Sequence, residues 1–156
     1  MGNFLVIGGS GVMGQAAIKA VRKKFGNNAN IIANWYGKVD TNISIDGATK
    51  TIFGDISDPD CVNQILAVYN DPFDYMFYAT ALGEVGVPIS QANKESIDQS
   101  NRLSFDPILM LEEKLNIKII VTYSTFYVIR HQLATYGAMG FSKDCLLYTS
   151  PSPRES

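Results

Sequence analysis

The sequence predicts a doubly wound parallel α/β sheet with about five strands, and three observations support that prediction. A short apolar run at residues 4–7 passes directly into a glycine-rich turn. Further apolar runs alternate with segments of helical periodicity along the chain. A polar or glycine-containing cluster follows each of these runs. Strands that alternate with helices in this way form a parallel sheet with helices packed on its faces.

The first strand and the turn GGSGVMG carry the most specific signal. Residues 4–7 have no polar interruption, as expected of a strand buried on both faces. In the turn, Gly8 suits a tight bend, Gly11 permits close approach of a phosphate, and Gly14 lets the following helix lie near the sheet. The turn predicts a phosphate site at a helix start, with a plain glycine-rich turn as the alternative. The candidate residues are Gly8, Gly9, Ser10, Gly11, Val12, Met13 and Gly14.

The remaining elements follow from periodicity and breaker residues. Further strands are predicted near residues 31–36, 50–53, 75–79 and 117–122. A helix is predicted from residue 15 to residue 25, with Ala16, Ala17, Ala20 and Val21 buried and with Lys19, Arg22, Lys23 and Lys24 on a solvated face. A second helix begins at a capped segment, residues 57–60. A long helix spans residues 94–115, and Pro107 is expected to bend or divide it.

Composition limits the class of protein. The chain has 156 residues, 46% of them hydrophobic, which suits a single α/β domain with a substantial core. The formal net charge of −2 predicts no nucleic-acid partner. We expect no signal peptide, membrane span or metal site, and the widely separated Cys61 and Cys145 predict reduced thiols in a cytoplasmic protein.

Polar clusters follow all five predicted strands, at the edge where a doubly wound sheet opens its ligand crevice. These clusters are residues 8–14, residues 35–38, Asp55, residues 80–83 and residues 123–127. Their convergence predicts one binding site assembled from five loops.

These features resemble the short-chain dehydrogenase/reductase family, with a Rossmann-like fold, over residues 1–145. The resemblance implies that Asp55, with Ile56, contacts the adenine of a dinucleotide, and that Ala79, Thr80 and Ala81 line the cofactor. For Asp55 the alternative is a helix cap for Ser57 onward. The resemblance also implies that Asn101 supports a proton relay, whereas a polar helix-surface residue is the alternative.

The chemical centre is expected in the segment VTYSTFYVIRHQLATYGAMGFSK. Tyr136 is followed four positions later by Gly140, but Lys143 lies two helical turns after Tyr136 and on the same face. The pattern is similar to the YxxMxxxK of enoyl thioester reductases. Tyr136 is then the donor that stabilises an enolate, and Lys143 orients the cofactor. The alternative is a packing tyrosine and a solvated lysine.

Other residues leave the chemistry open. The second tyrosine of those reductases aligns with Phe126, beside Tyr127 and Tyr123, and Ser124 is the alternative that suits a carbonyl reductase or a sugar-nucleotide epimerase. A non-catalytic dinucleotide sensor is a third hypothesis. Lys38 follows the second strand with no acid before Asp40, and it favours NADP over NAD.

The family resemblance implies further strands, helices and a substrate lid, and the fold is expected to be incomplete at its C-terminal end. Residues 146–156 include Pro151 and Pro153 and predict a non-native-looking disordered tail in which the helix begun at Tyr136 has stopped. We therefore expect the N-terminal part of a longer homo-oligomeric enzyme, acting on a small-molecule or acyl-thioester substrate.

Overall fold

The computed structural model describes residues 2–37, 43–82, 86–124 and 137–149. The chain divides into two compact units. The first unit comprises Met1–Thr80 and Ile108–Thr122, and the second comprises Ala81–Pro107 and Tyr123–Ser156.

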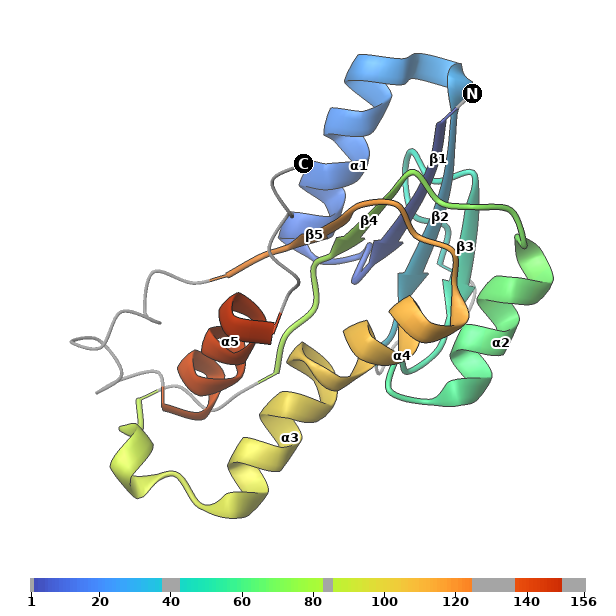
Figure 1. Cartoon of the computed structure of the whole chain (residues 1–156). Helices are drawn as coiled ribbons and strands as arrows, with labels where there is room; N and C mark the ends of the chain where they lie inside the picture. Colours follow the sequence, from blue (N-terminus) through green and yellow to red (C-terminus); the bar gives the residue numbers. More distant parts are fainter. Residues whose placement is uncertain (1, 38–42, 83–85, 125–136, 150–156) are drawn as a thin grey trace, which may run out of the picture. The chain divides into compact units, whose positions relative to one another are not determined.

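The first unit contains a parallel sheet of five strands in the order β3-β2-β1-β4-β5 (Figure 1). The strands are β1 (Gly2–Ile7), β2 (Ala29–Trp35), β3 (Lys50–Phe53), β4 (Tyr75–Tyr78) and β5 (Ile120–Thr122). The chain runs outward from β1 to β3 and then returns to place β4 on the other side of β1. The predicted doubly wound parallel sheet is therefore confirmed, with its reversal of strand order between β1 and β4.

The strand registers bring the carboxyl ends of all five strands to one edge. Ile7 pairs with Asn34 on one side and with Tyr78 on the other. At the outer positions Trp35 pairs with Phe53, and Tyr78 pairs with Thr122. Because each strand ends at this edge, the segments that directly follow β1 to β4 start there.

Both faces of the sheet are covered, as the unbroken apolar strands predicted. Helix α1 (Val12–Phe25) lies on one face of the sheet, and α2 (Pro59–Val68) and α4 (Asp106–Lys114) lie on the other (Figure 1). Phe4 and Val6 belong to the core on the α1 face, together with Ile18 and Val21. Leu5 and Ile7 alternate with them and are fully buried against the opposite layer. Burial of the whole run is the reason for its lack of polar residues.

The buried stripe of α1 differs from the one predicted. Its buried residues are Gly14, Ala17, Ile18 and Val21, whereas Ala16 and Ala20 are exposed. Packing of Gly14 against the turn sets the rotation of the helix, so that Ile18 takes the inward position. An alanine has too little apolar surface to determine which face is buried.

Arg22 corrects a second prediction, because it is not part of a solvated basic face. Its guanidinium donates to the carbonyl oxygens of Gly47 at 2.7 Å, Ala29 at 2.8 Å and Gly26 at 2.9 Å. It also donates to the hydroxyl of Thr49 at 3.0 Å. Arg22 thus ties the end of α1 to the segments that lead into β2 and β3, while Lys23 and Lys24 remain exposed.

Replacing Arg22 by methionine is expected to lower the free energy of unfolding by about 2 kcal/mol, since several charge-assisted hydrogen bonds to carbonyl oxygens, two of them partly buried, are lost. Urea denaturation followed by tryptophan fluorescence measures this change. Lys23→Met, on the exposed side of the same turn, is the control and is expected to change the free energy of unfolding by less than about 0.5 kcal/mol. Equal effects of the two substitutions would contradict the assignment.

The predicted helix over residues 94–115 is divided, as expected from Pro107. It forms α3 (Lys94–Ser104) and α4, with a break at Phe105. Asn93 caps α3 by accepting a hydrogen bond from the Ser96 amide at 2.8 Å. Asp58 caps α2 by accepting from the Asp60 amide at 2.9 Å, which confirms the predicted capped start. In the first turn of a helix the backbone amides have no intrahelical acceptor, so a proline early in α4 removes no helical hydrogen bond.

Several predicted boundaries were wrong. The first helix begins at Val12 rather than at residue 15. The fifth strand begins at Ile120 rather than at residue 117, where only an isolated bridge joins Phe73 to Ile117. The last helix, α5 (Gly137–Thr149), does not stop at Leu146. Pro151 disfavours helix mainly at the residue before it, so the segment up to Thr149 can stay helical.

The short 3-10 helices η1 (Gly26–Asn28) and η2 (Ile89–Gln91) complete the described elements. In the second unit, α5 packs against α3 and η2.

Candidate dinucleotide site and candidate catalytic residues

The glycine turn after β1 leaves little or no room for side chains at Gly8, Gly9 and Gly14; a Cβ on Gly9 would meet Ala33 Cβ and Ile45 Cδ1 at 3.0 Å. Gly8 has φ +77°, and a Cβ there would meet the backbone of Ala79 and Thr80 at 3.0–3.1 Å. A Cβ on Gly14 would lie 2.2 Å from the carbonyl oxygen of Gly8. A Cβ on Gly11 would meet only that same oxygen, at 3.4 Å, which is an ordinary contact. Gly8 and Gly14 are therefore required by the fold itself, whereas Gly11 leaves open space in front of the turn.

The hydrogen bonds of the turn leave a group of amides unused. Gly9 N–H donates to Asn34 O at 2.8 Å, and Gly11 N–H donates to Gly8 O at 3.0 Å. The first bond of the helical ladder runs from Gln15 N–H to Gly11 O at 2.9 Å. Within the described part of the chain, no acceptor faces the amides of Ser10, Val12, Met13 and Gly14. Four amide donors at a helix start form an arrangement that suits an anion.

The side chains around these amides are open to solvent. Ser10 and Gly11 are exposed, and the exposed fractions are 86% for Val12 and 47% for Met13. Ser10 to Met13 thus form the exposed part of the turn at the end of β1, whereas Gly9 and Gly14 are buried, and Gly8 lies next to the backbone of Ala79 and Thr80.

Asp55 lies in the first unit, after β3, and forms a local turn. Its Oδ1 accepts hydrogen bonds from the amide and the hydroxyl of Ser57, at 2.9 and 2.7 Å. The alternative in which Asp55 caps the next helix was wrong, because Asp58 is the cap. Ile56 is buried, with 3% of its surface exposed. The contact between Asp55 and an adenine stays a prediction.

Asn34, which sequence reasoning did not select, connects the Asp55 segment to the glycine turn. It is 2% exposed, and its Nδ2 donates to Gly54 O at 3.0 Å and to Cys61 Sγ at 3.2 Å. Its carbonyl oxygen accepts from Gly9. A polar residue inside an otherwise apolar strand was the available signal, because a buried amide needs partners. Burial raises the pKa of the Cys61 thiol to about 11, which keeps it neutral.

Asn101 and Lys143 both belong to the second unit. Asn101 lies on α3, and its Oδ1 is buried without a hydrogen-bond donor among the described residues. Lys143 lies on α5 with 5% exposure, so the alternative of a solvated lysine was wrong. Burial lowers the pKa of Lys143 to about 8. Desolvation of an ammonium is costly, and perturbed groups of this kind gather at functional sites.

A group of buried serine hydroxyls lies between α3 and α5, next to Asn101 and Lys143 in the sequence. Ser100 Oγ lies 2.8 Å from Ser142 Oγ and donates to Leu82 O at 2.7 Å. Ser142 Oγ donates to Met139 O at 3.0 Å, and Ser104 Oγ donates to Leu82 O at 3.3 Å. The three serines are fully buried. Sequence reasoning missed them because a serine in a helix is common on a surface.

The structure describes some of the remaining predicted site residues and not others. Ser124 is exposed, and burial raises the pKa of the neighbouring Tyr123. Ala81, in the second unit, is exposed. Lys38, Tyr127 and Tyr136 lie outside the described residues. Their roles stay predictions.

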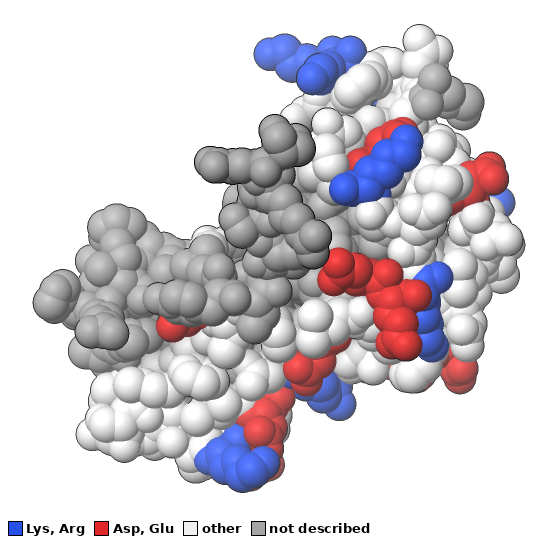
Figure 2. Space-filling view, viewed as in Figure 1, with Lys and Arg blue, Asp and Glu red and all other residues white. Residues whose placement is uncertain are grey.

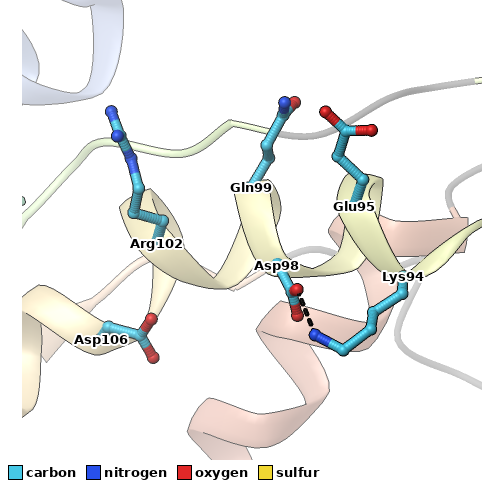
Figure 3. Close-up of a pocket in the computed structure, with 6 residues that line it drawn as sticks. All are labelled: Lys94, Glu95, Asp98, Gln99, Arg102 and Asp106. Carbon is cyan, nitrogen blue, oxygen red and sulfur yellow. Dashed lines mark hydrogen bonds and ion pairs between the residues drawn. The ribbon is translucent and has the colours of Figure 1, made fainter.

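Within the described ranges, charged residues outside the glycine turn do not form a competing site. An open depression of about 610 Å³ is lined by Lys94, Glu95, Asp98, Gln99, Arg102 and Asp106 (Figure 3). Its charges are mixed, and Lys94 pairs with Asp98. Acidic and basic side chains are also interspersed on the face shown in Figure 2. Among the described residues, three or more potential metal ligands do not gather anywhere.

The structure resembles solved short-chain dehydrogenases/reductases. A short chain dehydrogenase family protein from Francisella tularensis has a TM-score of 0.72 and 22% identity, with 95% of this chain and 60% of that chain covered. A 3-ketoacyl-(acyl-carrier-protein) reductase from Brucella melitensis, complexed with NADH, has a TM-score of 0.72 and 13% identity over 94% of this chain and 66% of that chain. A short-chain dehydrogenase/reductase from Saccharomyces cerevisiae has a TM-score of 0.76 and 14% identity, with 95% of this chain and 62% of that chain covered.

Neither a family model nor a curated protein matches the sequence. The chain spans 60 to 66% of the length of the similar solved chains quoted above. None of the helices in the described ranges has the length and apolarity needed to cross a membrane. At these identities the likeness establishes the fold: the chain has the Rossmann-like sheet of the short-chain dehydrogenases/reductases.

Proposed function

We propose that the chain is the cofactor-binding part of an NAD(P)H-dependent oxidoreductase of the short-chain dehydrogenase/reductase type. The observation that carries the proposal is the row of four unused amides at the start of α1, held by a turn that excludes side chains at Gly8 and Gly14. These amides fit the pyrophosphate of a dinucleotide. The similar structures support the same ligand class, since the reductase from Brucella melitensis was solved in complex with NADH.

The chain's own residues divide the work as follows. The amides of Ser10, Val12, Met13 and Gly14 hold the pyrophosphate, and Asp55 accepts from the adenine amino group. To Lys143, a buried amine of the second unit, we assign the role that the family resemblance implies: its positive charge would orient the cofactor when bound. Tyr136 provides the hydroxyl that stabilises the developing oxyanion. The cofactor, when bound, supplies the hydride.

For the substrate we propose an enoyl thioester, on the similarity of YGAMGFSK to the enoyl thioester reductase pattern. A carbonyl reductase is the second candidate, and the exposed Ser124, two residues after β5, favours it. The preferred cofactor is NADPH, because Lys38 follows β2 and no acid lies between Trp35 and Lys38. We further propose a cytoplasmic protein that assembles with copies of itself.

Titration of the chain with NADPH and NADH, followed by tryptophan quenching, tests cofactor binding. The fluorophore is Trp35, the only tryptophan of the chain, which lies at the end of β2. Tighter binding of NADPH supports the role of Lys38, and absence of binding by either nucleotide refutes the proposal.

Nicotinamide absorbance after addition of an enoyl thioester or a 3-ketoacyl thioester then separates the two substrate classes. Binding without turnover of either substrate favours a dinucleotide sensor.

A further inference from the structure

Gln15, the residue after the last glycine of the turn, reaches back from α1 to the turn itself. Its side-chain Nε2 donates a hydrogen bond to the carbonyl oxygen of Gly9 at 2.9 Å. Its own backbone amide already donates to Gly11 O. Gln15 therefore holds the turn through both its backbone and its side chain, and its side chain is only partly exposed.

The contact between Gln15 and the Gly9 carbonyl also determines the direction of the Ser10 N–H, because both groups belong to one planar peptide group. A peptide bond is planar and trans, so its carbonyl oxygen and the following N–H point in opposite directions. All described peptide bonds here are trans. When Gln15 fixes the carbonyl of Gly9, it also fixes the direction of Ser10 N–H, which points away from the Gln15 amide. Ser10 N–H is one of the amides without an acceptor in the described chain.

The neighbouring peptide group is held independently, at both of its ends. Gly9 N–H donates to Asn34 O, and the carbonyl oxygen of Gly8 accepts from Gly11 N–H. Among the peptide groups between Gly8 and Gly11, only the Gly9–Ser10 group is held by a side chain. Glycine tolerates many backbone conformations, so a peptide group that follows Gly9 can rotate at small cost unless it is held.

We propose that Gln15 is a positioning residue that aims the Ser10 amide at the ligand phosphate. This inference rests on the proposed dinucleotide site and adds a specific device to it. Pre-orientation matters because a donor that must first rotate loses part of its hydrogen-bond energy to the cost of ordering. Gln15 touches the turn and not the phosphate, so its effect is indirect.

The test is Gln15→Met in the full chain, because methionine keeps the length and the helix propensity of glutamine but removes the donor. ADP-ribose is the probe, and its dissociation constant is measured by calorimetry. We expect binding to weaken about tenfold, as for loss of one well-placed hydrogen bond. The matched control is Gln99→Met, an exposed glutamine on α3, which is expected to leave the dissociation constant unchanged.

A spectroscopic readout separates positioning from a general loss of structure. In Gln15→Met the backbone amide resonance of Ser10 is expected to shift and broaden, while that of Gly9, held by Asn34, stays in place. Adenosine, which lacks phosphate, is expected to cause equal shifts in both proteins. An unchanged dissociation constant for ADP-ribose in Gln15→Met overturns this inference and leaves the proposed function standing. A loss of adenosine binding in parallel also overturns it. Failure of the unmodified chain to bind ADP-ribose overturns the proposed function and this inference together.

Discussion

Replacing Gly14 by alanine is expected to destabilise the protein by about 3 kcal/mol and to abolish dinucleotide binding. The new methyl group would lie 2.2 Å from Gly8 O and 2.8 Å from Gly8 C and Gly9 Cα. All three are backbone atoms, so no side chain can move aside to make room. The helix must separate from the turn, and the row of free amides is lost with it. Urea denaturation gives the change in stability, and NADPH titration gives the change in binding.

Gly11→Ala is the matched control, because it adds the same methyl group to the same turn. Gly11 has φ −78°, which alanine adopts without strain, and its Cβ would meet only Gly8 O at 3.4 Å. We expect the free energy of unfolding to change by less than about 0.5 kcal/mol. Binding of NADPH is expected to fail nonetheless, since the methyl group occupies the space in front of the amides.

These two variants separate the structural glycine from the binding glycine. If Gly14→Ala remained as stable as the unmodified chain, the close contact between α1 and the turn would not exist in solution. If Gly11→Ala bound NADPH normally, the open space in front of Gly11 would not be where the pyrophosphate lies.

The free energy of unfolding is expected to rise with pH from about 8 to 10.5 through the titration of Lys143. Burial lowers the pKa of this lysine from 10.5 to about 8 in the folded chain. Between those values the unfolded chain binds more protons than the folded chain, so stability increases with pH. The full effect is on the order of 3 kcal/mol. At pH 7 the buried ammonium costs stability, and above the window the cost is gone.

Lys143→Met is the variant that isolates this effect, and the measurement is urea denaturation at several pH values. The difference in unfolding free energy between the unmodified chain and Lys143→Met is expected to rise over the same window. Cys61 titrates in an overlapping pH range, and its effect on stability has the opposite sign. Because its pKa is raised in the folded chain, the free energy of unfolding falls as pH increases from 9 toward 11. Both proteins contain Cys61, so its contribution cancels in the difference. A difference that stays flat between pH 7 and 10 would show that the Lys143 ammonium is solvated.

The elements that could be predicted from sequence are those with a strong local pattern. The apolar run at residues 4–7 and the glycines after it specify a buried strand and a tight turn, and both are present. Pro107 divides a helix for a reason that is local to the backbone. Boundaries were less certain at residue 117 and at Leu146, where neither residue forces a start or an end.

The candidate site was predictable only in part, because function depends on which groups lack partners. Gly11 and Gly14 are both glycines of the same turn and cannot be told apart by residue type. Of the two, only Gly14 lies so close to backbone atoms that a Cβ would clash with them. Gln15 and Asn34 carry no motif, and their importance comes from the carbonyl groups that folding brings to them. The sequence predicted that Arg22 is a solvated cation, whereas in the folded chain its guanidinium donates hydrogen bonds to four acceptors.

The sequence by itself determined the parallel sheet, the glycine turn at its edge and the order of the elements, since periodicity and backbone preferences act over short distances. Only the tertiary structure decided which amides stay free for a ligand, which glycine has no space, and that Lys143 is buried. Those properties depend on contacts between segments far apart in the chain, and no local pattern encodes them.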